Sequence, residues 1–338
     1  MLRMTSMRPP ERALKRLSVT AGIVALALTS AACTDSVGSA DVTGAGTTGT
    51  LEKTHLTVGA LAVNDDAPLY LAIKDGLFRQ VGLTVTTLPV AASTEAIPDM
   101  LRGTVDIMAG ANYVSFFQAE DKGVVHFKIL ADASHCTAST FEVMTLPGSG
   151  IAGPADLAGK SVAVNLTGNV QTLTLNSVLQ ANSISSSSVH YVQIPFPDMV
   201  AALKAHRVDA ISTLEPYITA SEEEDGAVPV VSQCTGPTAN FPMSGYFATS
   251  SWASKYPKTA RAFEQAIDKA QALADSNQQA VRSVLPTYTK ISPQTADVMS
   301  MAVYPDTVSV TALQQVAAMM RSAGMLSRPL SVQSLIPG

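Results

Sequence analysis

The sequence has no excess of positive charge, and it has no long hydrophobic run beyond its first thirty residues. It contains 22 Lys and Arg against 27 Asp and Glu, which gives a formal net charge of −5. Nucleic-acid-binding surfaces and membrane-surface helices are usually basic, so this balance argues against both. We therefore expect no nucleic-acid partner and no membrane-spanning helix in the folded part of the chain.

The sequence also lacks the short motifs of common enzyme and metal sites. It contains no P-loop, no Gly-x-Ser-x-Gly nucleophile elbow and no His-Glu-x-x-His helix. His135 stands beside Cys136, but no further Cys or His follows at metal-ligand spacing. We therefore expect a binding protein that is not an enzyme and that holds neither a metal nor a cofactor.

The apolar run that does occur belongs to an export signal. It extends from Leu17 to Leu28, follows a basic start and ends in Ser30-Ala31-Ala32-Cys33. This pattern predicts a signal peptide over residues 1–32, too short in its apolar part to span a bilayer stably. The small residues before Cys33 also resemble a bacterial lipobox, which would make Cys33 the lipidated first residue. Ser30 replaces the usual Leu of that box, so ordinary cleavage after Ala32 is the alternative.

A segment rich in Gly, Ser and Thr follows the signal. Residues 34–53 contain almost no large apolar side chain, which predicts a flexible linker. Residues 33–53 would thus tether an exported domain to the outer face of the cell membrane. Outside the cytoplasm the remaining cysteines, Cys136 and Cys234, are expected to form a disulfide, with two free thiols as the alternative.

Strands and helices alternate along the rest of the chain. The stretch Ala67–Leu83 predicts a helix that Pro68 fits in its first turn and that Gly76 ends, with strands on either side. Further strands are predicted at residues 84–88, 105–109, 127–131, 161–164, 191–194 and 208–211. This alternation predicts an α/β fold with a largely parallel sheet, and the length from residue 55 onward suffices for two lobes.

Three segments resemble the SsuA-like family of ABC-importer substrate-binding proteins, which includes nitrate, sulfonate, taurine and thiamine-precursor receptors. Pro68–Leu83 is similar to its P-L-Y-x-A-x-x-x-G-x-F-x-x-x-G-L phrase, and Leu101–Asp106 to its L-x-x-G-x-V-D phrase. Asp156–Val162 is similar to its D-L-x-G-K-x-V phrase. The matches occur in the family's order and cover about residues 55–285. The resemblance implies a hinged, two-lobe type II periplasmic-binding-protein fold. Lobe 1 would be residues 55–134 plus 243–338, and lobe 2 residues 135–242, with the ligand cleft between them.

The resemblance also implies a function. The chain would be an extracytoplasmic solute-binding lipoprotein, expected to be a monomer, that closes on a small nitrogen- or sulfur-containing organic solute. It would deliver this solute to a membrane permease driven by an ATPase. A sensor or partner lipoprotein of the same fold is one alternative. An enzyme of the pyrimidine-synthase-like branch is another, although that branch is cytosolic and carries a cysteine-rich motif that this sequence lacks.

In the implied fold, loops at strand ends and helix starts line the cleft. The residues that we expect to bind the ligand are Asn64, Asp65, Asp66, Ser93, Thr94, Asn112, Tyr113, Thr167, Gly168, Asn169, Glu215 and Tyr246. For Asp66 the alternative is a helix cap, for Tyr113 a place in the core, and for Glu215 a solvated turn.

These loops carry carboxylates but neither Lys nor Arg. Carboxylates suit an ammonium or a ring amine through charge-assisted hydrogen bonds, and they repel a sulfonate or nitrate. We therefore expect a neutral or cationic nitrogen-containing solute, such as a pyrimidine thiamine precursor or an amine. A zwitterion such as taurine stays open.

Overall fold

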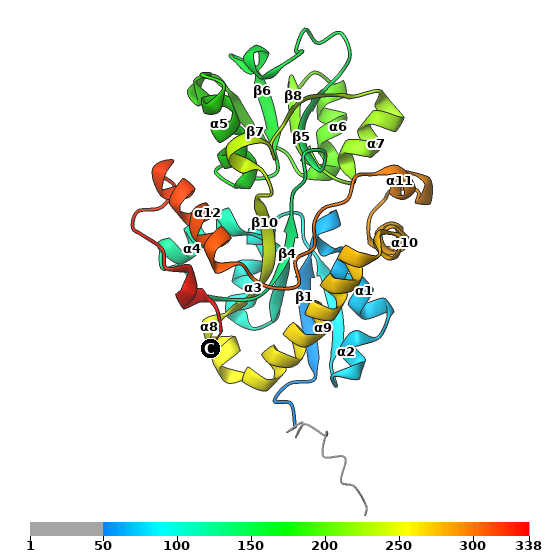
Figure 1. The fold of residues 1–338 in the computed structure, drawn as a ribbon, viewed down its shortest axis with the longest axis vertical. Coiled ribbons are helices and arrows are strands. Elements are labelled where there is room, and N and C mark those ends of the chain that lie inside the picture. The colour runs from blue at the N-terminus through cyan, green and yellow to red at the C-terminus, as the bar shows by residue number, and fades with distance from the viewer. Residues whose placement is uncertain (1–49, 338) are drawn as a thin grey trace, which may run out of the picture. The chain divides into compact units, whose positions relative to one another are not determined.

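The computed structural model describes residues 50–337, and within this range the strands form two five-stranded sheets (Figure 1). The expected signal peptide, Cys33 and the linker up to residue 49 lie outside the described residues. No helix within residues 50–337 is long and apolar enough to cross a membrane.

The first sheet has the strand order β2-β1-β3-β10-β4. β1 pairs in parallel with β2 and β3, whereas β10 runs antiparallel to both β3 and β4. The sheet is therefore mixed. β10 comes much later in the chain, inserts between β3 and β4, and runs in the opposite direction to both. Its strands are β1 (His55–Ala60), β2 (Thr84–Pro89), β3 (Ile107–Asn112), β4 (Phe127–His135) and β10 (Pro242–Thr249).

The second sheet repeats this plan, with the order β7-β6-β8-β5-β9. β6 pairs in parallel with β7 and β8, and β5 runs antiparallel to β8 and β9. β4 and β10 lie side by side and carry the chain toward and away from this sheet (Figure 1). Its strands are β5 (Phe141–Thr145), β6 (Ser161–Val164), β7 (His190–Gln193), β8 (Ala210–Leu214) and β9 (Val228–Ser232).

Helices cover the first sheet on both faces, because alternate residues of its strands are buried on opposite sides. Tyr246 of β10 belongs to the cluster under α1, α9 and α10, and its neighbour Phe247 to the cluster under α4 and α12. The helices of this part are α1 (Ala67–Lys74), α2 (Leu77–Gln80), α3 (Ile97–Arg102), α4 (Tyr113–Asp121), α8 (Ser250–Lys255), α9 (Pro257–Ser276), α10 (Gln278–Tyr288), α11 (Pro293–Val298) and α12 (Val310–Ser322).

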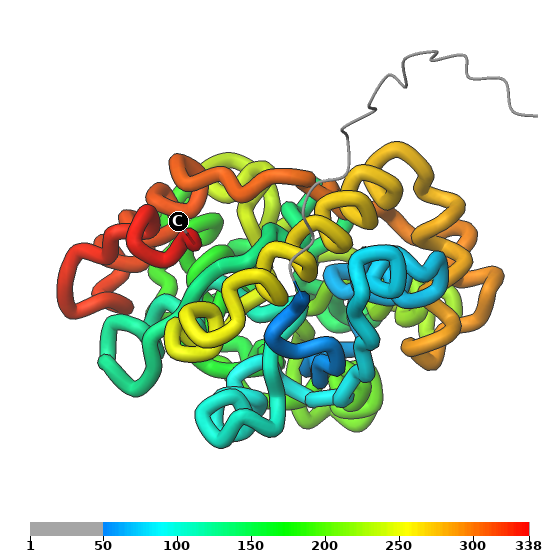
Figure 2. The backbone as a smooth tube through the Cα atoms, turned by 90° about the horizontal axis from the view of Figure 1, so that it is seen from below, coloured from blue at the N-terminus to red at the C-terminus, as the bar shows by residue number. Residues whose placement is uncertain are grey.

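The long helix α9 follows from its sequence pattern. Ala262, Phe263, Ala266, Ile267 and Ala270 recur at helical spacing, and all five are buried. Figure 2 shows α9 (yellow) beside α1 (light blue), which it contacts. This packing fixes α1 and the loop that leads into it.

The second sheet is covered in the same way, by α5 (Val170–Ala181) on one face and by α6 (Phe196–Lys204) and α7 (Tyr217–Asp225) on the other. Cys136, just after β4, is joined by a disulfide to Cys234, just after β9, with 6.0 Å between their Cα atoms. The bond therefore fastens together the two segments that connect the sheets.

Candidate functional site

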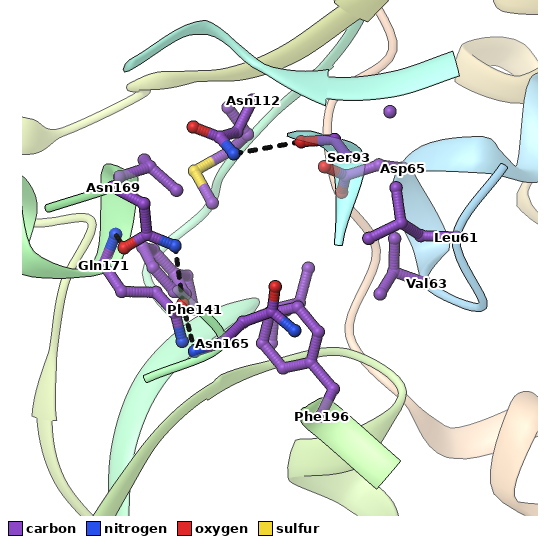
Figure 3. A pocket seen from close by; sticks show the side chains of 14 residues that line it. Leu61, Val63, Asp65, Ser93, Asn112, Phe141, Asn165, Asn169, Gln171 and Phe196 are labelled. Atoms are coloured by element: carbon purple, nitrogen blue, oxygen red, sulfur yellow. Dashed lines mark hydrogen bonds between the residues drawn. The ribbon is translucent and has the colours of Figure 1, made fainter. Parts of the chain in front are cut away.

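A cavity that is partly open to solvent lies where the two sheets face each other (Figure 3). Its walls combine seven apolar side chains with six polar ones, and small-molecule sites likewise join apolar walls to placed polar groups. The first sheet and the loops that follow its strands contribute Leu61, Val63, Asp65, Ser93, Gly110, Asn112 and Met243. The second sheet and its helices contribute Phe141, Asn165, Asn169, Val170, Gln171, Phe196 and Leu214.

Asp65 is the charged residue of this lining. It lies in the short helical turn Asn64–Asp66 that follows β1, and it is 6% exposed. Burial raises the pKa of its carboxyl, while hydrogen bonds from Ser244 and Ser134 oppose that shift. The Ser244 hydroxyl donates to Oδ2 at 2.6 Å. The carboxyl is therefore held in place by a strand that comes much later in the chain.

Asn112 ends β3 and begins α4 at the same edge of the cavity. Its Oδ1 accepts a 2.8 Å hydrogen bond from the backbone N–H of Ser115, which caps α4. Its Nδ2 donates to Oγ of Ser93 at 3.2 Å. Both predicted residues thus meet in the lining, as part of one hydrogen-bonded pair.

Three amide side chains form the facing wall. Oδ1 of Asn169 accepts from the backbone N–H groups of Gln171 and Thr172 and so caps α5. Oε1 of Gln171 accepts from Nδ2 of Asn169 at 2.9 Å and from the backbone N–H of Asn165 at 2.8 Å. Gln171 also donates to the Ser212 carbonyl at 2.6 Å, so it joins the start of α5 to β8.

Hydrogen bonds join the two sides of the cavity. Nδ2 of Asn165 donates to the Ala91 carbonyl at 3.1 Å, and the Tyr217 hydroxyl donates to the Ala62 carbonyl at 3.1 Å. Nε2 of Gln118 donates to the Gly168 carbonyl at 3.0 Å. The two halves are therefore closed on each other around the cavity.

Several predicted residues lie outside this lining. Asp66 is fully buried, and its Oδ2 accepts from the backbone N–H of Leu61 at 2.6 Å instead of capping α1 through its side chain. Burial raises its pKa well above the ordinary value. Glu215 is buried beside the cavity, where its carboxylate accepts from Thr219 and from the backbone N–H of Ser300.

Both tyrosines also belong to the interior. Tyr113 packs against Phe117 and Phe247, and its hydroxyl donates to Asp132 at 3.0 Å. Tyr246 is fully buried against Phe263. Asn64 lines a smaller neighbouring hollow, whereas Thr94, Thr167 and Gly168 stand near the cavity but not in its lining.

Sequence reasoning missed all seven apolar residues of the lining and two of its amides. Asn165 and Gln171 flank the predicted segment Thr167–Asn169, so the loop was found but not the side chains that face the cavity. No local sequence pattern predicts Phe141 or Phe196 as a lining residue. Each reaches the cavity only because of where β5 and α6 are placed in the fold.

Comparison with known proteins shows which sequences are similar. The chain matches the family model described as NMT1/THI5 like over residues 64–281. It is 35% identical over 141 residues to a putative ABC transporter periplasmic binding protein of Brachyspira hyodysenteriae, covering 40% of this chain and 38% of that protein. It is 26% identical over 293 residues to the nitrate/nitrite binding protein NrtA of Synechococcus elongatus, covering 76% and 65%. The chain thus spans less than two thirds of the length of these curated relatives.

Solved structures share the fold. The alkanesulfonate-binding protein SsuA from Xanthomonas axonopodis pv. citri, bound to MOPS, superposes with a TM-score of 0.72 at 16% identity, covering 85% of this chain and 99% of that one. The nitrate-binding protein NrtA from Synechocystis PCC 6803 gives 0.71 at 16% identity, covering 85% and 86%. The desulfurization enzyme DSZB gives 0.61 at 17% identity, covering 84% and 96%. The predicted two-lobe fold is confirmed, and it is a fold that serves binding proteins and at least one enzyme.

Proposed function

This chain belongs to the NMT1/THI5-like family, within the nitrate/sulfonate group of ABC-transporter substrate-binding proteins, and from that premise we propose that it is a solute receptor of an ABC importer. The observation that carries the proposal is the cavity itself. Residues of both sheets line it, and hydrogen bonds such as that from Tyr217 to the Ala62 carbonyl close it.

The receptor would work by hinge closure. Lobe 1, residues 55–134 plus 243–338, and lobe 2, residues 135–242, would separate about the connections that the disulfide fastens together. A solute contacted by both lobes binds the closed form better than the open one, so it shifts the population toward closure. The closed form then presents one joined surface to the permease and its ATPase.

The site favours a binding role over catalysis. Its polar groups are amides, one serine and one carboxylate, and no nucleophile paired with a base lies among the lining residues. We propose Asp65, Ser93, Asn112 and Asn169 as the ligand-binding core of the predicted set. The solute would be a small nitrogen- or sulfur-containing organic molecule.

The receptor would be held outside the cell membrane by a lipid on Cys33. The basic start, apolar run and small residues before this cysteine support that anchor. Metabolic labelling of the full-length protein with a palmitate analogue tests it. Label retained by wild type and lost in Cys33→Ser is expected, and unlabelled wild-type protein would show simple secretion.

Solute binding is tested on residues 48–338, which form one compact unit. A panel of sulfonates, nitrate, pyrimidines and amines should contain a solute that stabilises the protein, by about 2.7 kcal/mol at a hundredfold excess over Kd. Mass spectrometry should recover this solute unchanged. A panel without any stabilising member contradicts the receptor function, and a chemically altered solute favours the enzyme alternative.

A further inference from the structure

Two of the helix starts at this cavity, those of α4 and α5, are capped by the protein's own side chains. Free N–H groups at a helix N-terminus form a ready site for an anion. At α4, however, Asn112 takes the N–H of Ser115, and at α5 Asn169 takes those of Gln171 and Thr172. An oxyanion at either start would have to compete with an asparagine cap for these N–H groups.

The lining offers nothing else that would neutralise an anion. None of the fourteen lining residues is Lys or Arg, and the charge that they contain is the carboxyl of Asp65. The N–H groups left over on Asn112 and Asn169 are uncharged donors. A free nitrate or sulfonate would therefore exchange its hydration for neutral donors beside a carboxylate of like charge.

Hydrogen-bond acceptors remain on both sides of the cavity. A carboxylate has room for about four hydrogen bonds, and Asp65 receives those of Ser244 and Ser134. Asn165 uses its Nδ2 on the Ala91 carbonyl, while its Oδ1 has no partner within residues 50–337. Asn165 is 7% exposed, and Figure 3 shows its side-chain oxygen directed into the cavity, on a different side from Asp65.

We propose that this cleft selects a solute with hydrogen-bond donors at two ends, an amine or amidine cation directed at Asp65 and a second N–H or O–H directed at Asn165. The inference rests on the receptor function proposed above and narrows its solute class. The body of the solute lies against apolar walls that include Phe141 and Phe196. Because each acceptor belongs to a different lobe, such a solute also holds the lobes together.

Three probes with one shared body test this selection. 4-Aminobenzamidine, 4-aminobenzamide and 4-aminobenzoate each carry an amino donor on a benzene ring, and their head groups are cationic, neutral and anionic. We expect titration calorimetry to give the amidine a Kd at least tenfold below that of the amide, with the benzoate weakest. Nitrate should not compete with the amidine.

Two variants locate the contacts. Asp65→Asn should weaken the amidine at least tenfold and leave the amide within about threefold, because the substitution removes the charge and keeps one acceptor oxygen. Asn165→Leu, on the other lobe, should weaken both the amidine and the amide severalfold. Asp75→Asn removes a carboxylate from an exposed position outside the cavity and should change neither.

The outcomes separate the inference from the function on which it rests. Benzoate or nitrate binding as tightly as the amidine, or an unchanged order of probes in Asp65→Asn, overturns the inference and leaves a solute receptor. If none of the three probes binds while an oxyanion of the wider panel does, the inference is likewise overturned and the receptor function remains. If no solute of any charge binds, both the inference and the receptor function fall.

Discussion

The hydroxyl of Ser244 donates a 2.6 Å hydrogen bond to Oδ2 of Asp65, and 179 residues separate the two in the chain. The contact exists because β10 lies antiparallel beside β3 and so brings Ser244 to the end of the strand that carries Asn112. It fixes the charged group of the cavity from a second segment. The charge state of Asp65 therefore depends on β10 as well as on its own loop.

Binding of a cationic solute should weaken on acidification. Burial raises the pKa of Asp65 above the ordinary 3.8, and the nearby charge of Asp132 adds a smaller upward shift. Asp132 itself is hydrogen-bonded to His135. A cation needs the carboxylate, so its affinity should fall as the pH decreases through this raised pKa. Calorimetry with 4-aminobenzamidine between pH 8 and 4 measures the midpoint.

The same titration has an internal check. Ser244→Ala removes a hydrogen bond that favours the carboxylate, so the midpoint should move to higher pH. In Asp65→Asn the residual binding should lose this dependence. A midpoint that stays the same in Ser244→Ala would show that Asp65 is not the titrating group.

Replacing Asp66 by Asn should stabilise the protein at neutral pH. Asp66 is fully buried, its Oδ1 has no partner within residues 50–337, and burial raises its pKa well above 3.8. A carboxyl with a raised folded-state pKa favours the fold at low pH, and this contribution is lost as the pH rises through that pKa. The gain from Asp66→Asn should therefore grow as the pH rises above about 4 and level off once the pH has passed the raised pKa.

Urea unfolding of both proteins over this range measures the gain, with the exposed Asp75→Asn as the matched control. Asp66→Ala should be less stable than Asp66→Asn, because it also removes the acceptor for the N–H of Leu61. A gain that is constant with pH would contradict the assignment.

Gly110 is the glycine of the cavity that the fold requires. It has φ +57, and a Cβ there would lie 2.6 Å from Oδ1 of Asp66. Gly148 has φ +79, but a Cβ there would meet nothing within 4 Å. Both alanine variants incur backbone strain of about 1 kcal/mol or more. Gly110→Ala should lose about a further 1–3 kcal/mol through the clash, as measured by denaturant unfolding. Equal losses in the two variants would contradict the close approach.

Tyr217→Phe should weaken solute binding without weakening the fold. The hydroxyl donates across the cleft to the Ala62 carbonyl, and the ring stacks on Phe196 and stays in place. In the proposed hinge motion this hydrogen bond would be lost when the lobes open. Because such a bond contributes about 0.5–1.5 kcal/mol, affinity should fall about two- to tenfold. Tyr191→Phe removes a hydroxyl that bonds Asn176 within one lobe, and its affinity should match wild type. Equal affinities in all three proteins would show that this contact does not assist closure.

Breaking the disulfide should lower stability. Cys136 and Cys234 are 98 residues apart in the chain. Opening a loop of that size raises the conformational entropy of the unfolded chain. Cys136→Ser with Cys234→Ser should reduce the free energy of unfolding by about 2–4 kcal/mol. Wild type under reducing conditions should lose a similar amount, and an unchanged midpoint would show that the bond contributes little.

Local sequence patterns predicted the elements well. The helix after Asn64–Asp66 was predicted from Pro and Gly placement, and the strand at residues 161–164 was predicted as one of the alternating elements. The largely parallel character of the sheets was also predicted, but the one reversed strand in each, β10 and β5, was not. Strand direction depends on where the chain returns, and no local pattern records that.

The candidate site was predicted only in outline. Asp65 and Asp66 are adjacent and chemically identical, yet one lines the cavity and the other is fully buried against Gly110. Gln171 lies two residues past the predicted segment Thr167–Asn169 and was missed, although it ties Asn165 to Asn169. Each outcome depends on partners that stand elsewhere in the chain.

The sequence by itself determined the alternation of strands and helices, the family and the acidic character of the loops. These properties depend on residue type and short spacing, which the chain carries wherever it is folded. The tertiary structure alone decided which acceptors face the cleft and which carboxylate is buried away from it. Those depend on burial and hydrogen bonding between distant segments, such as the contact of Ser244 with Asp65, which form only when both sheets are in place.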